Sequence, residues 1–229
     1  MAAKKHLPVL LVTVAPESVS DAQIAELAQA GIIVSIGHSD TSAATAEAAF
    51  AAGARQATHL FNAMSQLQNR EPGVVGAVLA APDVFAGLIA DGIHVHPTVI
   101  RLALAAKQGP GRIFLVTDAM SQTGTDITSF TLNGRTIYRA EGALRLADGT
   151  LAGADLDMID AVHFMHTKVG LDWEECLRMA SLYPAQAAGV DAHHGHLKDG
   201  ALANFVELNE EMGIVSTWIE SEEQYRKAS

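Results

Sequence analysis

The chain has 229 residues, of which 49% are hydrophobic and 18% charged, with a formal net charge of −11 at pH 7. This composition supplies a sizeable core and excludes a disordered chain. The acidic balance disfavours a nucleic-acid partner, because phosphate binding needs clustered lysine and arginine. We expect neither a signal peptide nor a membrane partner, because no apolar run approaches the ~20 residues that span a bilayer. The single cysteine, Cys176, allows no internal disulfide and favours a cytoplasmic location.

The first half of the chain alternates short apolar runs with helix-forming segments, a pattern that predicts parallel strands with helices packed against them. The runs predict strands at 10–14, 32–36, 54–58, 84–90 and 112–117. Capping signals predict a helix through Ala30 begun by Ser20 or Asp21, one to Ala52 begun by Asp40 or Thr41, and one from Pro97 to Lys107. Between the second and third helices, a glycine-rich loop is expected at 70–76. These segments make five strand-helix units.

The pattern changes after Asp118. Asn133-Gly134 within 130–138 predicts a β-hairpin, and a second turn at 147–150 extends this antiparallel excursion. Beyond it we expect helices at about 155–168 and 172–180, and then short strands at 196–197, 204–208 and 214–218. The polar tail from Glu220 is expected to fray.

Three of the apolar runs end in side chains that carry chemistry. His38 follows the run 32–36, His59 follows 54–58, and Asp118 follows 112–117. The carboxyl ends of parallel strands meet at one rim, where α/β sheets and barrels place their active sites. Two imidazoles and a carboxylate at that rim indicate a metal-assisted hydrolase.

Several longer motifs surround these residues in a fixed order. They are Gly37-His38-Ser39, Thr58-His59-Leu60-Phe61-Asn62-Ala63-Met64, Arg70-Glu71-Pro72-Gly73, Asp91-Gly92-Ile93-His94 and Thr117-Asp118-Ala119. In order and spacing they resemble the N-acetylglucosamine-6-phosphate deacetylases, metal-dependent members of the amidohydrolase superfamily. The resemblance starts at Val12 and continues through Gly149–Ala154 to Gly195–Phe205. It therefore covers nearly the whole chain.

The resemblance implies an α/β fold, a partial (β/α)8 TIM-type barrel with about five of eight strand-helix units and a C-terminal β-sandwich remnant. The barrel part is expected over 8–190 with a β-hairpin insertion near 128–152, and the sandwich segment over 191–229. The family has three further barrel strands before this region, and a metal-ligating glutamate in a His-Leu-Glu-Gly-Pro-like motif. Neither is found in this sequence, and Glu17 follows the wrong strand to replace that ligand.

The same resemblance implies a role for each motif. His38 and His59 would bind a divalent metal, zinc or iron, weakly because a third ligand is absent, and Asp118 would be the general base and acid. The implied substrate-binding residues are Asn62, Ala63 and Arg70 around the phosphate, Asp91, Gly92, Ile93 and His94 at the acetyl group or sugar ring, and Leu151, Ala152, Gly153 and Ala154 as a loop over the sugar. The implied substrate is an N-acetylhexosamine 6-phosphate.

Several alternatives stay open. The chain is either a deacetylase or a truncated, non-catalytic remnant that binds sugar phosphate or a partner chain. A dihydroorotase-like ring opener is disfavoured by Asn62 and Arg70. Unpaired sheet edges favour a homodimer or higher self-association.

Individual residues also have simpler interpretations. Arg70 would form a surface ion pair with Glu71, and Asp118 would cap a helix or form a salt bridge at the end of the sheet. The pair His163 and His166 would lie on a solvated helix face, and Cys176 would pack in the core rather than act as a thiol.

Overall fold

The computed structural model describes residues 2–227, and its centre is a five-stranded parallel sheet. The strands lie side by side in the order in which they occur in the chain. They are β1 (Leu11–Val14), β2 (Ile33–Ile36), β3 (Gln56–Ala57), β4 (Phe85–Ile89) and β5 (Ile113–Val116). All five predicted strands are therefore confirmed, with shorter bounds. β1 and β5 are the two edges of this sheet.

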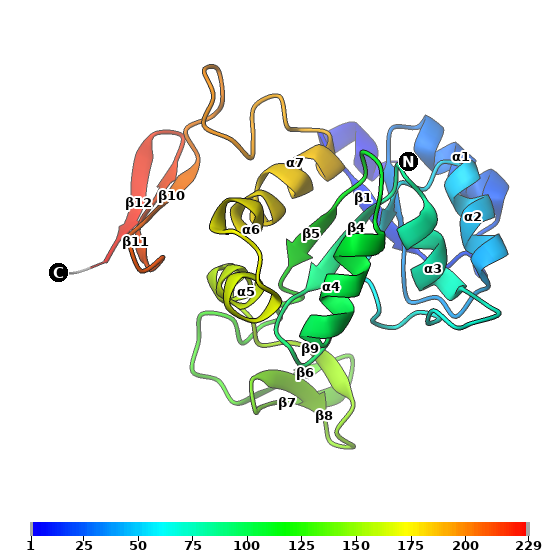
Figure 1. Ribbon diagram of the computed structural model, residues 1–229, viewed down its shortest axis with the longest axis horizontal. Helices are drawn as coiled ribbons and strands as arrows, with labels where there is room; N and C mark the ends of the chain where they lie inside the picture. The colour runs from blue at the N-terminus through cyan, green and yellow to red at the C-terminus, as the bar shows by residue number, and fades with distance from the viewer. Residues whose placement is uncertain (1, 228–229) are drawn as a thin grey trace.

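Helices connect these strands, as Figure 1 shows. They are α1 (Asp21–Gln29), α2 (Ala43–Ala51), α3 (Gly73–Ala80) and α4 (Pro97–Ala106), after a short 3-10 helix η1 (Ala3–His6). Ser20 caps α1 with a complete capping box, as predicted. The predicted caps of α2 are wrong, because Ser42 accepts the N–H of Thr45 and begins the helix later. Within residues 2–227, no helix has the length and apolar character needed to cross a bilayer.

The glycine-rich segment at 70–76 is only partly a loop, which corrects the sequence prediction. Helix α3 begins at Gly73, where φ is +62° and an added Cβ would lie 2.7 Å from the backbone oxygens of Ser65 and Gln66. Only glycine fits that position. Val74, Val75 and Val78 are fully buried beyond it, so the apolar run forms a core helix instead of continuing the loop.

Alternate strand residues and the helices form one hydrophobic core. Val34 and Ile36 of β2 and Leu88 of β4 belong to the same buried cluster as Ile24 of α1 and Ile100 of α4. The alternation of side chains along a strand sends their neighbours to the opposite face of the sheet. On that face Leu11 of β1 is 45% exposed, so the edge strand is covered on one side only.

Leu88→Ala is expected to destabilise the fold by about 2–5 kcal/mol, because Leu88 is fully buried at the centre of this cluster and its loss leaves a cavity. Urea unfolding followed by circular dichroism measures the change. Leu102→Ala on α4 is the matched control, since Leu102 is 65% exposed. Equal effects of the two substitutions would contradict the assignment of the core.

A four-stranded antiparallel sheet follows β5 and lies below α5 in Figure 1. Its strands are β6 (Ser129–Leu132), β7 (Arg135–Ala140), β8 (Ala143–Leu146) and β9 (Leu151–Ala154). The hairpin turn at Asn133-Gly134 and the turn at 147–150 are confirmed. The sequence did not predict the turn at Glu141-Gly142. Glu141 adopts a left-handed conformation (φ +52°), which asparagine adopts more readily than glutamate, so the residue type gave no turn signal.

Three helical segments after β9 pack against β5, and a small sheet ends the described chain. The segments are α5 (Met158–Phe164) with its π-helical extension η2 (Met165–Val169), α6 (Trp173–Ala180) and α7 (Leu182–Ala188), and the strands are β10 (Phe205–Leu208), β11 (Ile214–Ile219) and β12 (Glu222–Arg226). The sequence missed α7, which Gln56 holds by donating its side-chain N–H to the Ala187 carbonyl at 2.7 Å.

Two predictions for the C-terminal region are wrong. The segment 196–197 is not a strand. The tail from Glu220 does not fray, because residues 222–226 form β12 by pairing with β11. Residues 228–229, the end of that predicted tail, lie outside the described residues.

Candidate active site

Two histidines meet at the carboxyl ends of β2 and β3. The Nε2 atoms of His38 and His59 lie 3.0 Å apart, and their rings meet edge to face with centroids 4.7 Å apart. His38 is exposed, whereas His59 is 7% exposed. The sequence predicted that these two side chains converge, and the geometry confirms that convergence.

The donor set suits a metal ion in two respects. Two imidazole nitrogens that each bind one ion at about 2.0–2.1 Å lie roughly 3 Å apart. Burial lowers the pKa of His59, the Asp118 carboxylate raises it and His38 lowers it, and the resulting pKa is below its ordinary value. His59 is thus kept neutral, which is the form that binds metal. The set is nevertheless incomplete, since residues 2–227 hold no group of three or more His, Cys, Asp or Glu side chains arranged for a metal ion.

Asp118 follows the end of β5, at the same rim of the parallel sheet, and is exposed. Its negative charge is one of the influences that raise the pKa of His59. Its backbone carbonyl accepts the N–H of Ala154 at 3.1 Å, which ties the turn to β9. Asp118 does not begin a helix, since the segment after β5 leads into β6, and the helix-cap interpretation is wrong.

The backbone is strained where these residues sit. His38 (φ +51°), His59 (φ +30°) and Asp118 (φ +52°) all adopt left-handed conformations. Phe61 and Ala63 in the loop after β3 do the same. The other non-glycine residues of 2–227 with positive φ lie in tight turns of the two antiparallel sheets. Such conformations persist only where surrounding contacts hold them, and they cluster at functional sites.

A fourth candidate side chain, His94, is fixed by a buried carboxylate at the end of β4. Asp91 accepts the N–H groups of Ile93 and His94, each at 2.8 Å, and its second oxygen lies 2.5 Å from His94 Nδ1. Burial acts to raise the pKa of Asp91, but these hydrogen bonds outweigh it and lower the pKa. With Nδ1 donating to Asp91, His94 is left with Nε2 as its free nitrogen. Gly92 (φ +76°) completes this turn against the ring of Phe164.

The loops after β3 carry the predicted phosphate-binding residues. Asn62 is half-buried and Ala63 is exposed, and they follow His59 by three and four residues. Arg70 is exposed, and within residues 2–227 no hydrogen bond or ion pair joins it to the other candidate residues. The alternative interpretation of Arg70, a surface ion pair with Glu71, is wrong, because that carboxylate accepts the N–H groups of Ala43 and Gly73 instead.

The segment Leu151–Ala154 is a strand, β9, which corrects its interpretation as a loop over the sugar. Gly153 lies against the Asp118 turn so closely that an added Cβ would be 2.7 Å from the Met120 sulfur. Ala154 is fully buried and bridges to Ala119. β9 therefore supports the Asp118 turn from one side.

Residues 8–223 match the family model described as "Amidohydrolase family". The chain belongs to the amidohydrolase family. It is 40% identical to an N-acetylgalactosamine-6-phosphate deacetylase of Shewanella sp. over 97% of this chain and 56% of the relative. It is 38% identical to an N-acetylglucosamine-6-phosphate deacetylase of Haemophilus influenzae, over 90% of this chain and 54% of the relative. The chain thus spans little more than half the length of these relatives.

Solved structures agree with this amidohydrolase over the same region. The N-acetylglucosamine-6-phosphate deacetylase of Pasteurella multocida superimposes with a TM-score of 0.89 at 38% identity, over 93% of this chain and 56% of that one. A mutant of the Mycobacterium smegmatis enzyme, solved with N-acetyl-D-glucosamine-6-phosphate, gives a TM-score of 0.86 at 33% identity, over 93% and 57%.

Two groups of residues around this amidohydrolase site were missed by the sequence analysis. Thr58 Oγ1 lies 2.9 Å from Thr13 Oγ1 and 2.8 Å from Ser35 Oγ, which links β1 and β2 to the residue that follows β3 and precedes His59. Glu17 binds Ser39 and Asp40 directly after His38. Hydroxyls inside strands and a single loop glutamate carry no spacing signal, so only the geometry reveals them.

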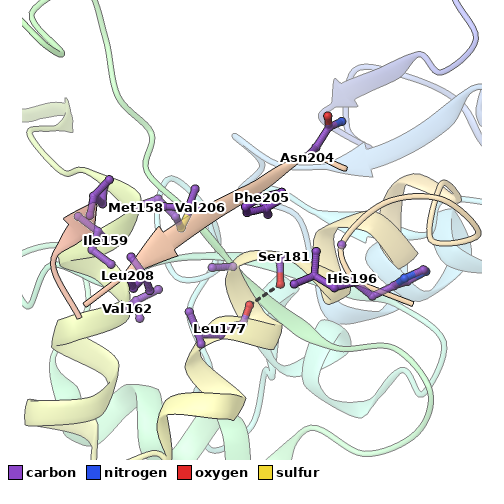
Figure 2. Close-up of a pocket in the computed structure, with 14 residues that line it drawn as sticks. Met158, Ile159, Val162, Leu177, Ser181, His196, Asn204, Phe205, Val206 and Leu208 are labelled. Carbon is purple, nitrogen blue, oxygen red and sulfur yellow. Dashed lines mark hydrogen bonds between the residues drawn. The ribbon is translucent and has the colours of Figure 1, made fainter. Parts of the chain in front are cut away.

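One pocket of this amidohydrolase lies away from these residues. It is a cavity of about 410 Å³ between α5, α6 and β10. Figure 2 shows its apolar walls, which include Val162, Leu177 and Phe205. None of the predicted site residues lines it. The chemistry predicted from the sequence is therefore not in this cavity.

The other candidate groups do not join the site. His166 stacks on Trp173 with ring centroids 3.9 Å apart, and His163 meets the same indole edge-on, so the pair packs on an aromatic ring rather than along a solvated face. Cys176 is fully buried, as predicted.

Cys176 is expected to resist alkylation in the folded amidohydrolase. Burial raises the pKa of its thiol to about 11, so the reactive thiolate is scarce at pH 8. Mass spectrometry after iodoacetamide treatment should find the native chain unmodified and the urea-unfolded chain fully modified. Rapid labelling of the native chain would contradict the core position.

Proposed function

We propose that this amidohydrolase cleaves the acetamide of N-acetylglucosamine 6-phosphate, giving glucosamine 6-phosphate and acetate in amino-sugar catabolism. The observation that carries the proposal is the convergence of His38 and His59 at 3.0 Å, at the sheet rim where β5 ends and Asp118 follows. The names of the relatives support the same substrate class, an N-acetylhexosamine 6-phosphate. The expected location is the cytoplasm.

The proposed reaction needs one group that moves protons. Asp118 accepts a proton from the attacking water, whose oxygen forms a bond to the acetyl carbon. Asp118 then donates a proton to the nitrogen as the C–N bond breaks, so that acetate and a free amine leave. In this proposal the carboxylate of Asp118, in its left-handed turn at the end of β5, makes both transfers.

His38 and His59 are the proposed ligands of a divalent metal, zinc or iron. When bound, the metal supplies Lewis-acid polarisation of the carbonyl and activation of water. Weak binding is expected from two protein ligands, because catalytic zinc sites usually have three. The neutral His59 and the rigid turns at both histidines are what this chain contributes.

The remaining residues orient the substrate in this proposal. His94, held by Asp91 with Gly92 and Ile93 in its turn, presents Nε2 to the acetyl oxygen or a ring hydroxyl. The phosphate would be bound by Asn62, the Ala63 N–H and Arg70, whose planar guanidinium suits phosphate oxygens. β9, including Leu151 and Ala152, would border the sugar beside Asp118.

The architecture proposed for this chain is a partial (β/α)8 barrel over 8–190, with the antiparallel insertion near 128–152, and a sandwich remnant over 191–229. The sequential order of the five parallel strands supports the barrel part. The separate sheet of β10, β11 and β12 supports the second part.

The test is acetate release from N-acetylglucosamine 6-phosphate by the purified chain with added Zn²⁺ or Fe²⁺. The His59→Ala variant is the background control, because it removes a proposed ligand. Metal-dependent release above that background is the expected result. Release no greater than with His59→Ala would overturn the activity.

A second candidate function is favoured by the incomplete ligand set within residues 2–227. In this alternative, the chain binds sugar phosphate or a partner chain without turnover. Substrate titration by calorimetry separates the two: binding with no acetate release favours the alternative, whereas turnover excludes it.

Self-association is part of the proposal. β1 is an edge strand, and its Leu11, on the sheet face opposite the core, is 45% exposed, a combination that proteins usually cover. A homodimer or larger assembly is expected by light scattering at micromolar concentrations. A monomer over the whole range would contradict it.

A further inference from the structure

Glu17 makes two hydrogen bonds that join the loop after β1 to the turn that carries His38. Its Oε2 accepts the hydroxyl of Ser39 at 2.6 Å, and its Oε1 accepts the N–H of Asp40 at 3.1 Å. Both partners directly follow His38 in the chain. One carboxylate therefore spans the turn on the C-terminal side of the histidine.

The His38 turn requires such a support. His38 has a φ of +51°, a conformation that a residue with a side chain keeps only when its surroundings hold it. Ser39 is 1% exposed and is the centre of that support. Its N–H donates to the Ala63 carbonyl at 3.0 Å, its carbonyl accepts from Ser65 N–H at 3.1 Å, and its hydroxyl donates to Glu17.

Glu17 is suited to hold the turn and not to bind the metal itself. Both of its oxygens are already directed at hydrogen-bond donors of residues 39 and 40. Burial acts to raise the pKa of Glu17, but the hydrogen bonds, that from Ser39 foremost, lower it below its ordinary value. The group is therefore an ionised acceptor at neutral pH. Within the described chain it belongs to no cluster of three metal-binding side chains.

We propose that Glu17 is a positioning residue, which acts through Ser39 and Asp40 to hold the His38 imidazole against His59. Ser39 also donates its N–H to the carbonyl of Ala63, one of the proposed phosphate-binding residues. The hydrogen bond from Ser39 to Glu17 therefore supports this loop as well. The proposal rests on the proposed function only where it assigns a metal to His38 and His59. Its geometric part concerns the metal-free chain alone.

The test compares Glu17→Ala with the wild-type chain, and Glu26→Ala is the matched control on the exposed surface of α1. Zinc affinity is measured by competition with a chelating dye, and Tm is measured in parallel. We expect Glu17→Ala to weaken zinc binding about tenfold, as loss of an outer-shell partner does. Glu26→Ala should have no effect, and the Tm of both variants should stay within a few degrees of wild type. Unchanged zinc affinity in Glu17→Ala would overturn the proposal, as would equal losses in both variants.

A second measurement uses no metal. Imidazole resonances of the metal-free chain, assigned with His38→Gln, should shift for His38 in Glu17→Ala and stay fixed in Glu26→Ala. Glu17→Gln keeps one acceptor oxygen and should give an intermediate shift, so it serves if the alanine variant folds poorly. If the wild-type chain binds no zinc, the metal part of the proposed function fails while this measurement still decides the role of Glu17. Identical His38 resonances in all variants would overturn it.

Discussion

Asp118→Asn is expected to lower kcat for acetate release by about 10²–10⁴-fold, which is the contribution typical of a general acid and base. Asparagine has nearly the same shape as aspartate and tolerates the left-handed φ of +52°, so the turn against β9 should stay intact. It cannot accept the proton from water or pass one to the amine. The measurement is steady-state acetate release at a fixed excess of Zn²⁺.

The control for this prediction is Asp126→Asn, the same change at an exposed aspartate in the segment between β5 and β6. It should leave kcat unaltered. Zinc affinity in Asp118→Asn should stay within a few-fold of wild type, because the carboxylate is not one of the two converging nitrogen ligands. A variant that keeps full kcat would show that another group moves the protons.

The parallel sheet could be predicted because its signals are local. Each buried strand is an apolar run, and helix α1 begins at a serine that caps it. Helices α3 and α7 were missed for opposite reasons. In α3 the glycines indicated a loop, yet burial of Val74 and its neighbours outweighed their cost. In α7 the stabilising contact comes from Gln56, which is far away in sequence.

In the candidate site, too, the local features could be predicted and the long-range contacts could not. The positions of His38, His59 and Asp118 followed from strand ends, and the meeting of the two histidines at one rim is a consequence of parallel topology. The contacts that fix them were not predictable. Glu17, in the loop after β1, binds Ser39 in the loop after β2. Ala154 of β9, which belongs to another sheet, donates its N–H to the Asp118 carbonyl. Such pairings depend on loop conformation, for which the sequence has no periodic signal.

His59→Ala is expected to abolish specific zinc binding, with a loss greater than the roughly 10–100-fold that removal of an outer-shell partner causes. His59 is the buried member of the pair, and this burial lowers its pKa below the ordinary value, which favours the neutral imidazole that binds metal. Without it, His38 is left as a single exposed imidazole, which binds zinc no better than any surface histidine.

His6→Ala is the matched control, because it removes an exposed imidazole in η1 and leaves the rim unaltered. Zinc competition with a chelating dye should give the wild-type affinity for this variant and only weak, nonspecific binding for His59→Ala. Circular dichroism should show both variants folded, since alanine at 59 removes one imidazole from the rim and no part of the apolar core. If His59→Ala and His6→Ala bound zinc equally well, the metal would have to lie elsewhere, and the convergence of the two Nε2 atoms would have to be explained as a histidine–histidine hydrogen bond alone.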